Sequence, residues 1–127
     1  MTIERLIDSV IFIDHFNGIS GATRFLLKLN PLQTAISVIT RAEILSGLDE
    51  VGRPAVLQFL NEYHLYIIDG FIADLAAEFR REFRWKLPDA FQAALAVHHR
   101  VKLTTRNTKD FNPTKHKFVE IPYRIRP

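Results

Sequence analysis

Cysteine is absent from this sequence of 127 residues. Its absence excludes disulfide bonds, thiolate catalysis and zinc sites built from cysteine, and it is typical of proteins that work in a reducing cytosol. A chain of this length can bury about two-thirds of the surface that its unfolded state exposes, so packing alone can stabilise it. We therefore expect a cytoplasmic protein without covalent cross-links.

Long apolar runs are missing as well. The first apolar stretch follows Glu4 and Arg5, and Asp8 and Asp14 interrupt it. Neither a secretory signal peptide nor a membrane-spanning helix can be built from such a stretch, so no membrane partner is expected. Internal repeats, low-complexity tracts and linkers are not found either, and we interpret residues 1–127 as one domain.

The histidines do not form a metal-binding motif. His98 and His99 are adjacent, so on a helix their side chains point about 100° apart and cannot act as a pair at positions i and i+4. We expect them at the surface or partly buried, with His98 sharing a helix face with Phe91, Ala94 and Leu95.

Charge is distributed unevenly along the chain, although the net charge is only +3. Residues 1–79 contain 5 Lys/Arg and 10 Asp/Glu (net −5), whereas residues 80–127 contain 12 and 4 (net +8). Such an asymmetry suggests a polyanionic partner. A solvated basic face is equally compatible with the charge alone.

Hydrophobic periodicity and turn residues predict strands that alternate with helices. The expected strands cover residues 3–7, 34–38, 64–68, 102–104 and 118–121, and the expected helices cover 10–16, 20–29, 41–48, 54–63 and 70–84, with another beginning at 88. This alternation predicts an α/β fold, a three-layer α/β/α sandwich with a central, mostly parallel sheet. Ligands of such sheets bind beyond the carboxyl ends of the strands, where the strand order reverses.

Acidic side chains from separate segments are expected to meet at this edge of the sheet. Asp8 follows the first strand, Glu43 lies just after the second, and Asp89 lies in the first turn of the helix that precedes the fourth. Asp110 belongs to the segment after the fourth strand. Oxygen ligands without a cysteine or histidine motif suit Mg²⁺ or Mn²⁺ better than zinc. These ions can activate water and offset charge on a phosphoryl oxygen, so phosphodiester hydrolysis is the chemistry implied.

Each of the three main acids also has a purely structural interpretation. Asp8 can cap the following helix, Glu43 can complete a capping box with Thr40, and Asp89 can interact with a helix dipole. These roles do not explain why three acids occupy the same side of the predicted sheet. Like charges gathered there raise one another's pKa and reduce stability unless a cation lies between them.

Four segments follow one another along the chain: LIDSVIFID (6–14), SVITRAEILSG (37–47), LPDAFQAALA (87–96) and LTTRNTKDF (103–111). Together they resemble the PIN domains and, among them, the VapC-type toxins of toxin–antitoxin pairs. The resemblance covers nearly the whole chain. It implies a Mg²⁺- or Mn²⁺-dependent endoribonuclease that cuts RNA, often tRNA or ribosomal RNA, together with a homodimer and inhibition by a cognate antitoxin.

The same resemblance implies roles for individual residues. Asp8, Glu43, Asp89 and Asp110 would form the catalytic group, with the metal ion on Asp8 and Asp89 and on Glu43 directly or through water. Three neighbouring polar residues are predicted to support them: Ser9, Thr105 and Asn107. Ser9 can orient a carboxylate, and Thr105 can hydrogen-bond to the site or simply end a strand. Basic residues that can contact RNA, or form a solvated helix end and loop, are Arg80, Arg81, Arg84, Lys86, Arg106 and Lys109.

Two positions depart from the family pattern. Val10 stands where a small polar residue is frequent, and Asn107 stands at the fourth acidic position, with Asp110 three residues later. An amide oxygen can accept a hydrogen bond but brings no charge. We therefore predict one tightly bound ion and a second that is weak, with Asp110 contributing only if its turn folds back to the site.

Two alternatives remain from the sequence. A receiver-like signalling domain also has clustered aspartates, but it would need an acidic pair near the first strand, and none precedes Asp8. A PIN-like module that binds RNA or a protein partner without cleavage is compatible with Val10 and Asn107.

Overall fold

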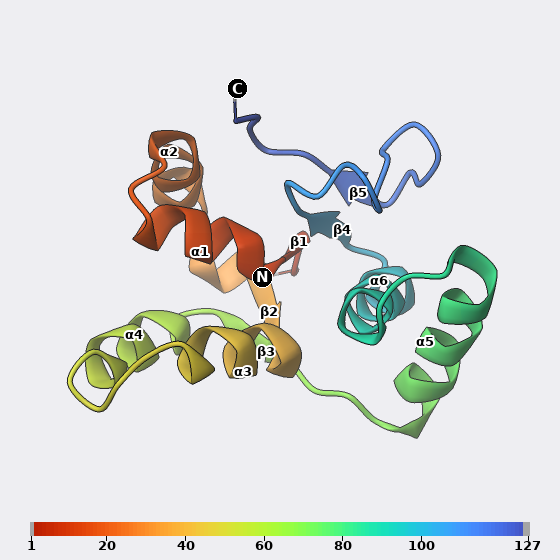
Figure 1. Ribbon diagram of the computed structural model, residues 1–127, viewed down its shortest axis with the longest axis horizontal. Helices are drawn as coiled ribbons and strands as arrows, with labels where there is room; N and C mark the ends of the chain where they lie inside the picture. Colours follow the sequence, from red (N-terminus) through yellow and green to blue (C-terminus); the bar gives the residue numbers. More distant parts are fainter. Residues whose placement is uncertain (1, 126–127) are drawn as a thin grey trace.

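In the computed structural model, which describes residues 2–125, five strands form a central sheet with helices on both faces (Figure 1). The strands are β1 (Arg5–Ile7), β2 (Thr34–Ser37), β3 (His64–Tyr66), β4 (Lys102–Thr104) and β5 (Val119–Glu120). Their order is β3-β2-β1-β4-β5, and every neighbouring pair is parallel. The three-layer α/β/α architecture predicted from the sequence is confirmed.

The helices lie in two groups, one on each face of the sheet (Figure 1). They are α1 (Ser9–Phe16), α2 (Ser20–Lys28), α3 (Val38–Ser46), α4 (Arg53–Leu60), α5 (Gly70–Phe83) and α6 (Leu87–His99), with a 3-10 turn, η1 (Pro31–Gln33), before β2. Helices α1 to α4 cover one face, and α5 and α6 cover the other. None of the helices within residues 2–125 has the length and apolar character needed to cross a membrane.

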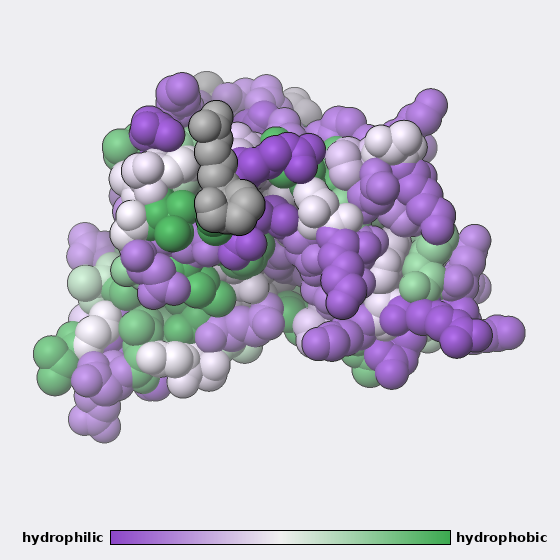
Figure 2. All heavy atoms as spheres, turned by 45° about the horizontal axis from the view of Figure 1, so that its top comes forward, coloured by the Kyte–Doolittle hydropathy of each residue, from purple (hydrophilic) through white to green (hydrophobic). Residues whose placement is uncertain are grey.

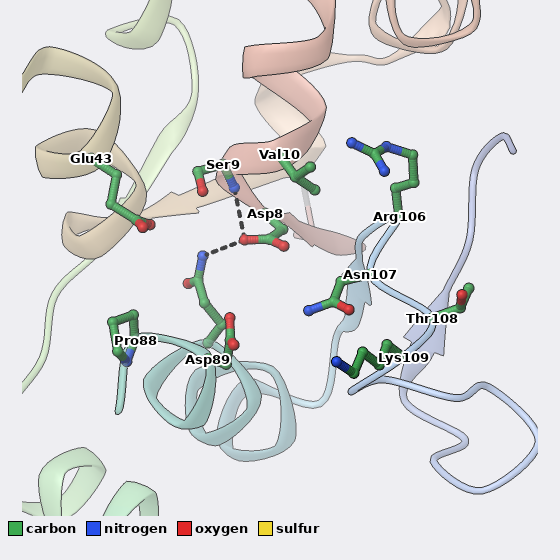
Figure 3. Close-up of a pocket in the computed structure, with 11 residues that line it drawn as sticks. Asp8, Ser9, Val10, Glu43, Pro88, Asp89, Arg106, Asn107, Thr108 and Lys109 are labelled. Carbon is green, nitrogen blue, oxygen red and sulfur yellow. Dashed lines mark hydrogen bonds between the residues drawn. The ribbon is translucent and has the colours of Figure 1, made fainter. Parts of the chain in front are cut away.

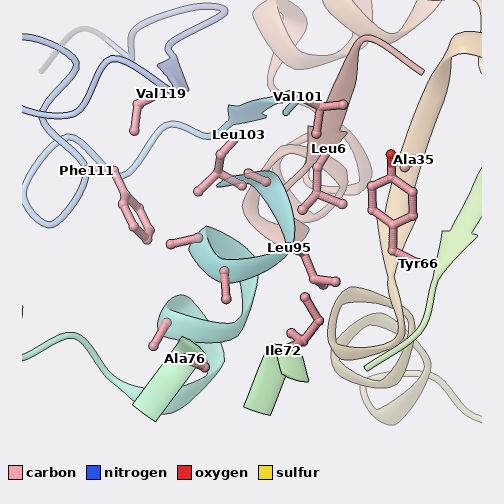
Figure 4. Close-up of a cluster of buried hydrophobic side chains, with 14 of the residues drawn as sticks. Leu6, Ala35, Tyr66, Ile72, Ala76, Leu95, Val101, Leu103, Phe111 and Val119 are labelled. Atoms are coloured by element: carbon pink, nitrogen blue, oxygen red, sulfur yellow. The ribbon is translucent and has the colours of Figure 1, made fainter. Parts of the chain in front are cut away.

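Alternate residues of the central strands supply two separate hydrophobic cores. Leu6 and Ala35 belong to the core under α5 and α6 (Figure 4), whereas Ile7 and Ile36 belong to the core under α1 to α4. Successive side chains of a strand point to opposite faces of the sheet, so short apolar strands can serve both cores. This two-sided burial explains why two consecutive residues are apolar in each strand, Leu6-Ile7 in β1 and Ala35-Ile36 in β2.

Helix α6 is buried over most of its circumference. Residues 92–96 are all buried, and the alanines among them are completely inaccessible to solvent, so the helix lies close to the sheet and to α5. Its last turn emerges from the core, and His98 and His99 are exposed. The prediction that the two histidines lie at the surface or partly buried is therefore confirmed, because the buried part of α6 ends at Ala96.

The strand order reverses at β1. From β1 the chain passes to β2 and β3 on one side, then crosses back to β4 and β5 on the other. The carboxyl ends of β1 and β4 thus border the crevice in which parallel α/β sheets bind ligands. Asp8 and Thr105 are the residues that directly follow these two strands.

Candidate functional site

A cavity of about 480 Å³ lies at the carboxyl end of β1 (Figure 3). Four segments line it, namely the start of α1, α3, the first turns of α6 and the loop after β4. The lining residues are Asp8, Ser9, Val10, Glu43, Pro88, Asp89, Gln92, Arg106, Asn107, Thr108 and Lys109. The three main acids predicted from the sequence are therefore brought to one cavity.

Asp8 is held in a fixed orientation at the end of β1. Its Oδ1 accepts from the Ser9 amide at 2.8 Å and from Gln92 Nε2 at 3.4 Å, and its Oδ2 accepts from the Thr105 hydroxyl at 2.8 Å. The residue is 8% exposed. Burial raises the pKa of the Asp8 carboxyl, and the hydrogen bonds from Thr105 and Gln92 oppose that rise. Asp8 also caps the N-terminus of α1. The same carboxylate therefore caps a helix and lines the cavity.

Glu43 reaches the cavity from the second turn of α3 (Figure 3). The helix begins earlier than predicted, because Ser37 ends β2 and its hydroxyl caps the Thr40 amide at 3.1 Å. The capping box with Thr40 at its start was therefore a wrong prediction, and Glu43 is free to face the site. Partial burial and the charge of Asp8 raise the pKa of the Glu43 carboxyl, while a hydrogen bond with the Ser9 hydroxyl lowers it.

Asp89 lies in the first turn of α6, directly after Pro88. Burial and the negative charges of Asp8, Asp110 and Glu43 raise the pKa of Asp89 to about 6, and only Lys86 opposes them. A carboxylate at a helix N-terminus would ordinarily be stabilised by the helix dipole. Burial, together with repulsion between the acids, therefore outweighs that benefit here.

Asp110 lies in a neighbouring cavity, although its negative charge still raises the pKa of Asp89. Its Oδ2 accepts from Asn107 Nδ2 at 3.0 Å, and its backbone amide donates to Asn107 Oδ1 at 3.3 Å. Asp110 lines a neighbouring cavity of about 380 Å³, whereas Asn107 lines the main one. The turn thus folds back toward the main cavity. The side chain that it places there is the neutral amide of Asn107, whereas the Asp110 carboxylate lies in the neighbouring cavity.

Of the three predicted supporting residues, Ser9 and Thr105 contact Asp8, and Asn107 contacts Asp110. Thr105 is completely buried, donates to Asp8 and accepts from the Asn107 amide at 3.1 Å. Ser9 donates its amide to Asp8, and its side chain lowers the pKa of Glu43. The hydroxyl of Thr105 therefore orients the Asp8 carboxylate.

The predicted basic residues are placed in different ways. Arg106 binds the carboxylate of the buried Asp14 with two guanidinium nitrogens, and its Nη2 lies 3.0 Å from Oδ1. Arg80 donates to the Trp85 backbone oxygen at 3.2 Å. Arg84 and Lys109 line the neighbouring cavity that also contains Asp110. The two others, Arg81 and Lys86, are exposed on α5 and just before α6.

The donor set of the main cavity fits a hard divalent cation. Mg²⁺ is usually bound through one or two carboxylates and keeps several waters. The carboxylates of Asp8, Asp89 and Glu43 line the cavity and are the groups that could hold such an ion. Within residues 2–125, no group of three or more histidine, cysteine, aspartate and glutamate side chains is arranged to hold one ion together.

Gln92 is a site residue that the sequence-based reasoning missed. It lies three residues after Asp89 on α6, lines the cavity and donates to Asp8. A pattern could have indicated it, because it is the one polar residue between Ala90 and Ala96 in a helix of buried alanines. Polar side chains on such a face are usually hydrogen-bonded to something specific.

Fold and cavity together define a parallel α/β/α domain with an acidic site at its switch point, and comparisons with known proteins identify its family. The PIN domain profile matches residues 5–117. The chain therefore belongs to the PIN domain family, as the four sequence segments indicated.

Several solved structures have the same fold, and one of them is part of a toxin–antitoxin complex. A chain of a toxin–antitoxin complex from Klebsiella pneumoniae is 36% identical, with a TM-score of 0.85 over 96% of this chain and 100% of that one. Two others share the fold at lower identity. DNA-bound VapBC from Salmonella typhimurium is 19% identical (TM-score 0.76, 96% and 100% covered), and FitAcB from Neisseria gonorrhoeae is 20% identical (TM-score 0.77, 93% and 97% covered). No curated protein matches the sequence.

Proposed function

We propose that this PIN domain protein is a divalent-metal-dependent endoribonuclease and the toxin of a VapBC-type toxin–antitoxin pair. The observation that carries the proposal is the convergence of Asp8, Glu43 and Asp89, each with a raised pKa, on one cavity at the switch point. The role as a toxin is supported by the Klebsiella pneumoniae relative, which belongs to a toxin–antitoxin complex.

The side chains of the cavity have distinct roles in this proposal. A bound Mg²⁺ or Mn²⁺ would supply positive charge next to the scissile phosphate and lower the pKa of a water molecule. Asp8, fixed from both sides by Thr105 and Gln92, and Asp89 provide ligand oxygens. Glu43 is more exposed than Asp8 and Asp89, and its pKa is raised, so it is the carboxylate best suited to accept a proton from the attacking water.

Purified, antitoxin-free protein tests the activity directly. We expect it to cut RNA in the presence of Mg²⁺ or Mn²⁺ and to lose that activity with a chelator, and sequencing of the new ends would identify the target. Binding of RNA without any cleavage would favour the alternative of a PIN-like binding module. That alternative is supported by Val10, which lines the cavity, and by Asn107, which takes the place of an acid there.

RNA binding is expected to depend strongly on salt. Contacts with about four phosphates of a single strand would reduce affinity by tens of fold between about 50 and 200 mM salt, since each contributes a slope near −0.7. Arg84 and Lys109 are the best placed to contact RNA phosphates, because they line the cavity that adjoins the main acidic cavity. Filter binding with Arg84→Glu should show weaker affinity and a shallower slope, whereas Arg53→Glu, on α4, should match the parent. A flat salt response would mean that the basic half has no RNA role.

A second copy of the chain and the antitoxin are the protein partners in this proposal. Hydrophobic side chains are available for such contacts: Ile13 and Phe16 of α1 are 42% and 44% exposed, and Val51 is 89% exposed. Figure 2 shows hydrophobic residues gathered on the left of the molecule, where α1 and α4 lie. Exposed apolar surface of this kind often marks an interface. Light scattering of the purified protein at micromolar concentration is expected to give a dimer mass, and a monomer mass would remove the homodimer from the proposal.

A further inference from the structure

The side-chain amide of Gln92 is buried at the base of the acidic cavity with only half of its hydrogen-bonding groups satisfied. The residue is 1% exposed. Its Nε2 donates to Thr40 Oγ1 at 2.7 Å and to Asp8 Oδ1 at 3.4 Å. Its Oε1 is buried and has no hydrogen-bond partner among residues 2–125. An unsatisfied buried carbonyl reduces stability, so its presence calls for a functional explanation.

The orientation of the amide follows from the chemistry of its neighbours. A carboxylate can only accept hydrogen bonds, so the NH₂ group of Gln92 must face Asp8. The same NH₂ group reaches Thr40, and the carbonyl oxygen is left pointing away from both. The unsatisfied oxygen is therefore a consequence of holding Asp8.

The hydrogen bonds of Gln92 link the three elements that carry the acids. Thr40 lies three residues before Glu43 on α3, and Gln92 lies three residues after Asp89 on α6. Residues three apart on a helix share a face, one turn from each other. The Thr40–Gln92–Asp8 network thus joins α3, α6 and the end of β1 one helical turn away from Glu43 and Asp89. All three members are buried.

We propose that Gln92 is a positioning residue, which fixes the Asp8 carboxylate and holds α3 and α6 at the separation that the metal site requires. This inference rests on the proposed function, since the ion is the Mg²⁺ or Mn²⁺ of the nuclease site. An apolar side chain of the same size would fill the space and avoid the unsatisfied carbonyl. It would leave Oδ1 of Asp8 with the Ser9 amide as its one remaining partner among the hydrogen bonds described above.

The test is Gln92→Met in the full chain, because methionine keeps the volume and removes the amide. Loss of a group that orients a metal ligand typically reduces metal affinity or activity about 10–100-fold. Calorimetry with Mn²⁺ on chelator-treated protein is expected to show a loss in this range, while the thermal midpoint is unchanged or higher. Gln58→Met is the matched control, since Gln58 is exposed on α4, and it should leave both quantities unchanged.

Two further measurements separate positioning from general packing. Thr40→Val removes the hydrogen bond that Gln92 donates to Thr40 and leaves the Gln92 amide in place. It should therefore reduce Mn²⁺ affinity by a smaller factor than Gln92→Met does. In NMR spectra of ¹⁵N-labelled protein, the side-chain amide of Gln92 should shift when Mg²⁺ is added, and it should not shift in Asp8→Asn.

The possible outcomes distinguish the inference from the proposed function. If the parent binds Mn²⁺ and Gln92→Met binds it equally well, Gln92 has no positioning role and the nuclease proposal is unaffected. A lower affinity accompanied by a lower thermal midpoint, with no Mg²⁺-induced amide shift, would also overturn the inference, in favour of a packing role. A parent protein that binds neither ion would overturn both.

Discussion

Asp8→Asn, Glu43→Gln and Asp89→Asn are each expected to reduce metal-dependent RNA cleavage by about 10²–10⁴-fold, the range typical of losing a positioned acid or base. The three acids come from different elements and face one cavity, so each substitution removes a charge that the other two cannot replace. Cleavage of a labelled RNA with Mn²⁺ measures the effect, and circular dichroism checks that the fold is retained. Full activity in all three variants would exclude this cavity as the active site.

Asp89→Asn should also make the metal-free protein more stable. The pKa of Asp89 is raised from 3.8 to about 6, so its ionised form destabilises the folded state at neutral pH. After allowance for solvent screening and for the lost helix-dipole interaction, we expect the free energy of unfolding to rise by about 1 kcal/mol. Asp74→Asn, on the exposed side of α5, is the control. A decrease of about 0.3–1 kcal/mol in Asp89→Asn would mean that the helix dipole dominates instead.

Arg106→Ala is expected to lower the free energy of unfolding by about 2–4 kcal/mol, because it leaves the buried carboxylate of Asp14 without its cationic partner. Asp14 is 5% exposed, and besides Arg106 it accepts a hydrogen bond from the Tyr123 hydroxyl at 2.7 Å. Burial raises the pKa of Asp14, but the hydrogen bonds from Arg106 and Tyr123 more than compensate, and the net shift is downward. Asp14 is therefore charged in the folded protein and depends on this partner.

Urea denaturation measures the effect, and Arg53→Ala, at the exposed start of α4, should leave stability unchanged. The two interpretations of Arg106 predict different results. If its main role were to contact RNA, as the sequence alone allowed, the variant would keep its stability and lose RNA affinity. Unchanged stability would therefore contradict the structural role that its bonds with Asp14 indicate.

The features that could be predicted from the sequence are those that follow from local periodicity. Strands that end at Ile7 and Ser37 can be recognised from short apolar runs, and parallel order then places Asp8 and Glu43 on one edge. The strand and helix pattern was therefore sufficient for the fold and for the approximate position of the acids.

Features that depend on contacts between distant residues could not be predicted. Gln92 and Asp8 are 84 positions apart, and Arg106 and Asp14 are 92 apart. The sequence around Gln92 can mark it as a buried polar residue, but no local pattern identifies its partner Asp8 or pairs Arg106 with Asp14. The start of α3 was misplaced for a related reason, because Ser37 and Thr40 can both begin a helix, and only the burial of Thr40 against Gln92 decides between them.

The central position of β1 has a consequence for the order in which the site is completed as the chain is synthesised. Residues 8 and 43 emerge from the ribosome well before residues 89 and 105. Strand β1 pairs on one side with β2 and on the other with β4, so half of its partners are added late. A nascent chain that ends before β4 lacks the Thr105 hydroxyl that holds Asp8. A shorter chain that ends before α6 also lacks Asp89. The acidic cavity therefore exists only when nearly all of the PIN domain has been made, and unfinished chains carry the acids without the site.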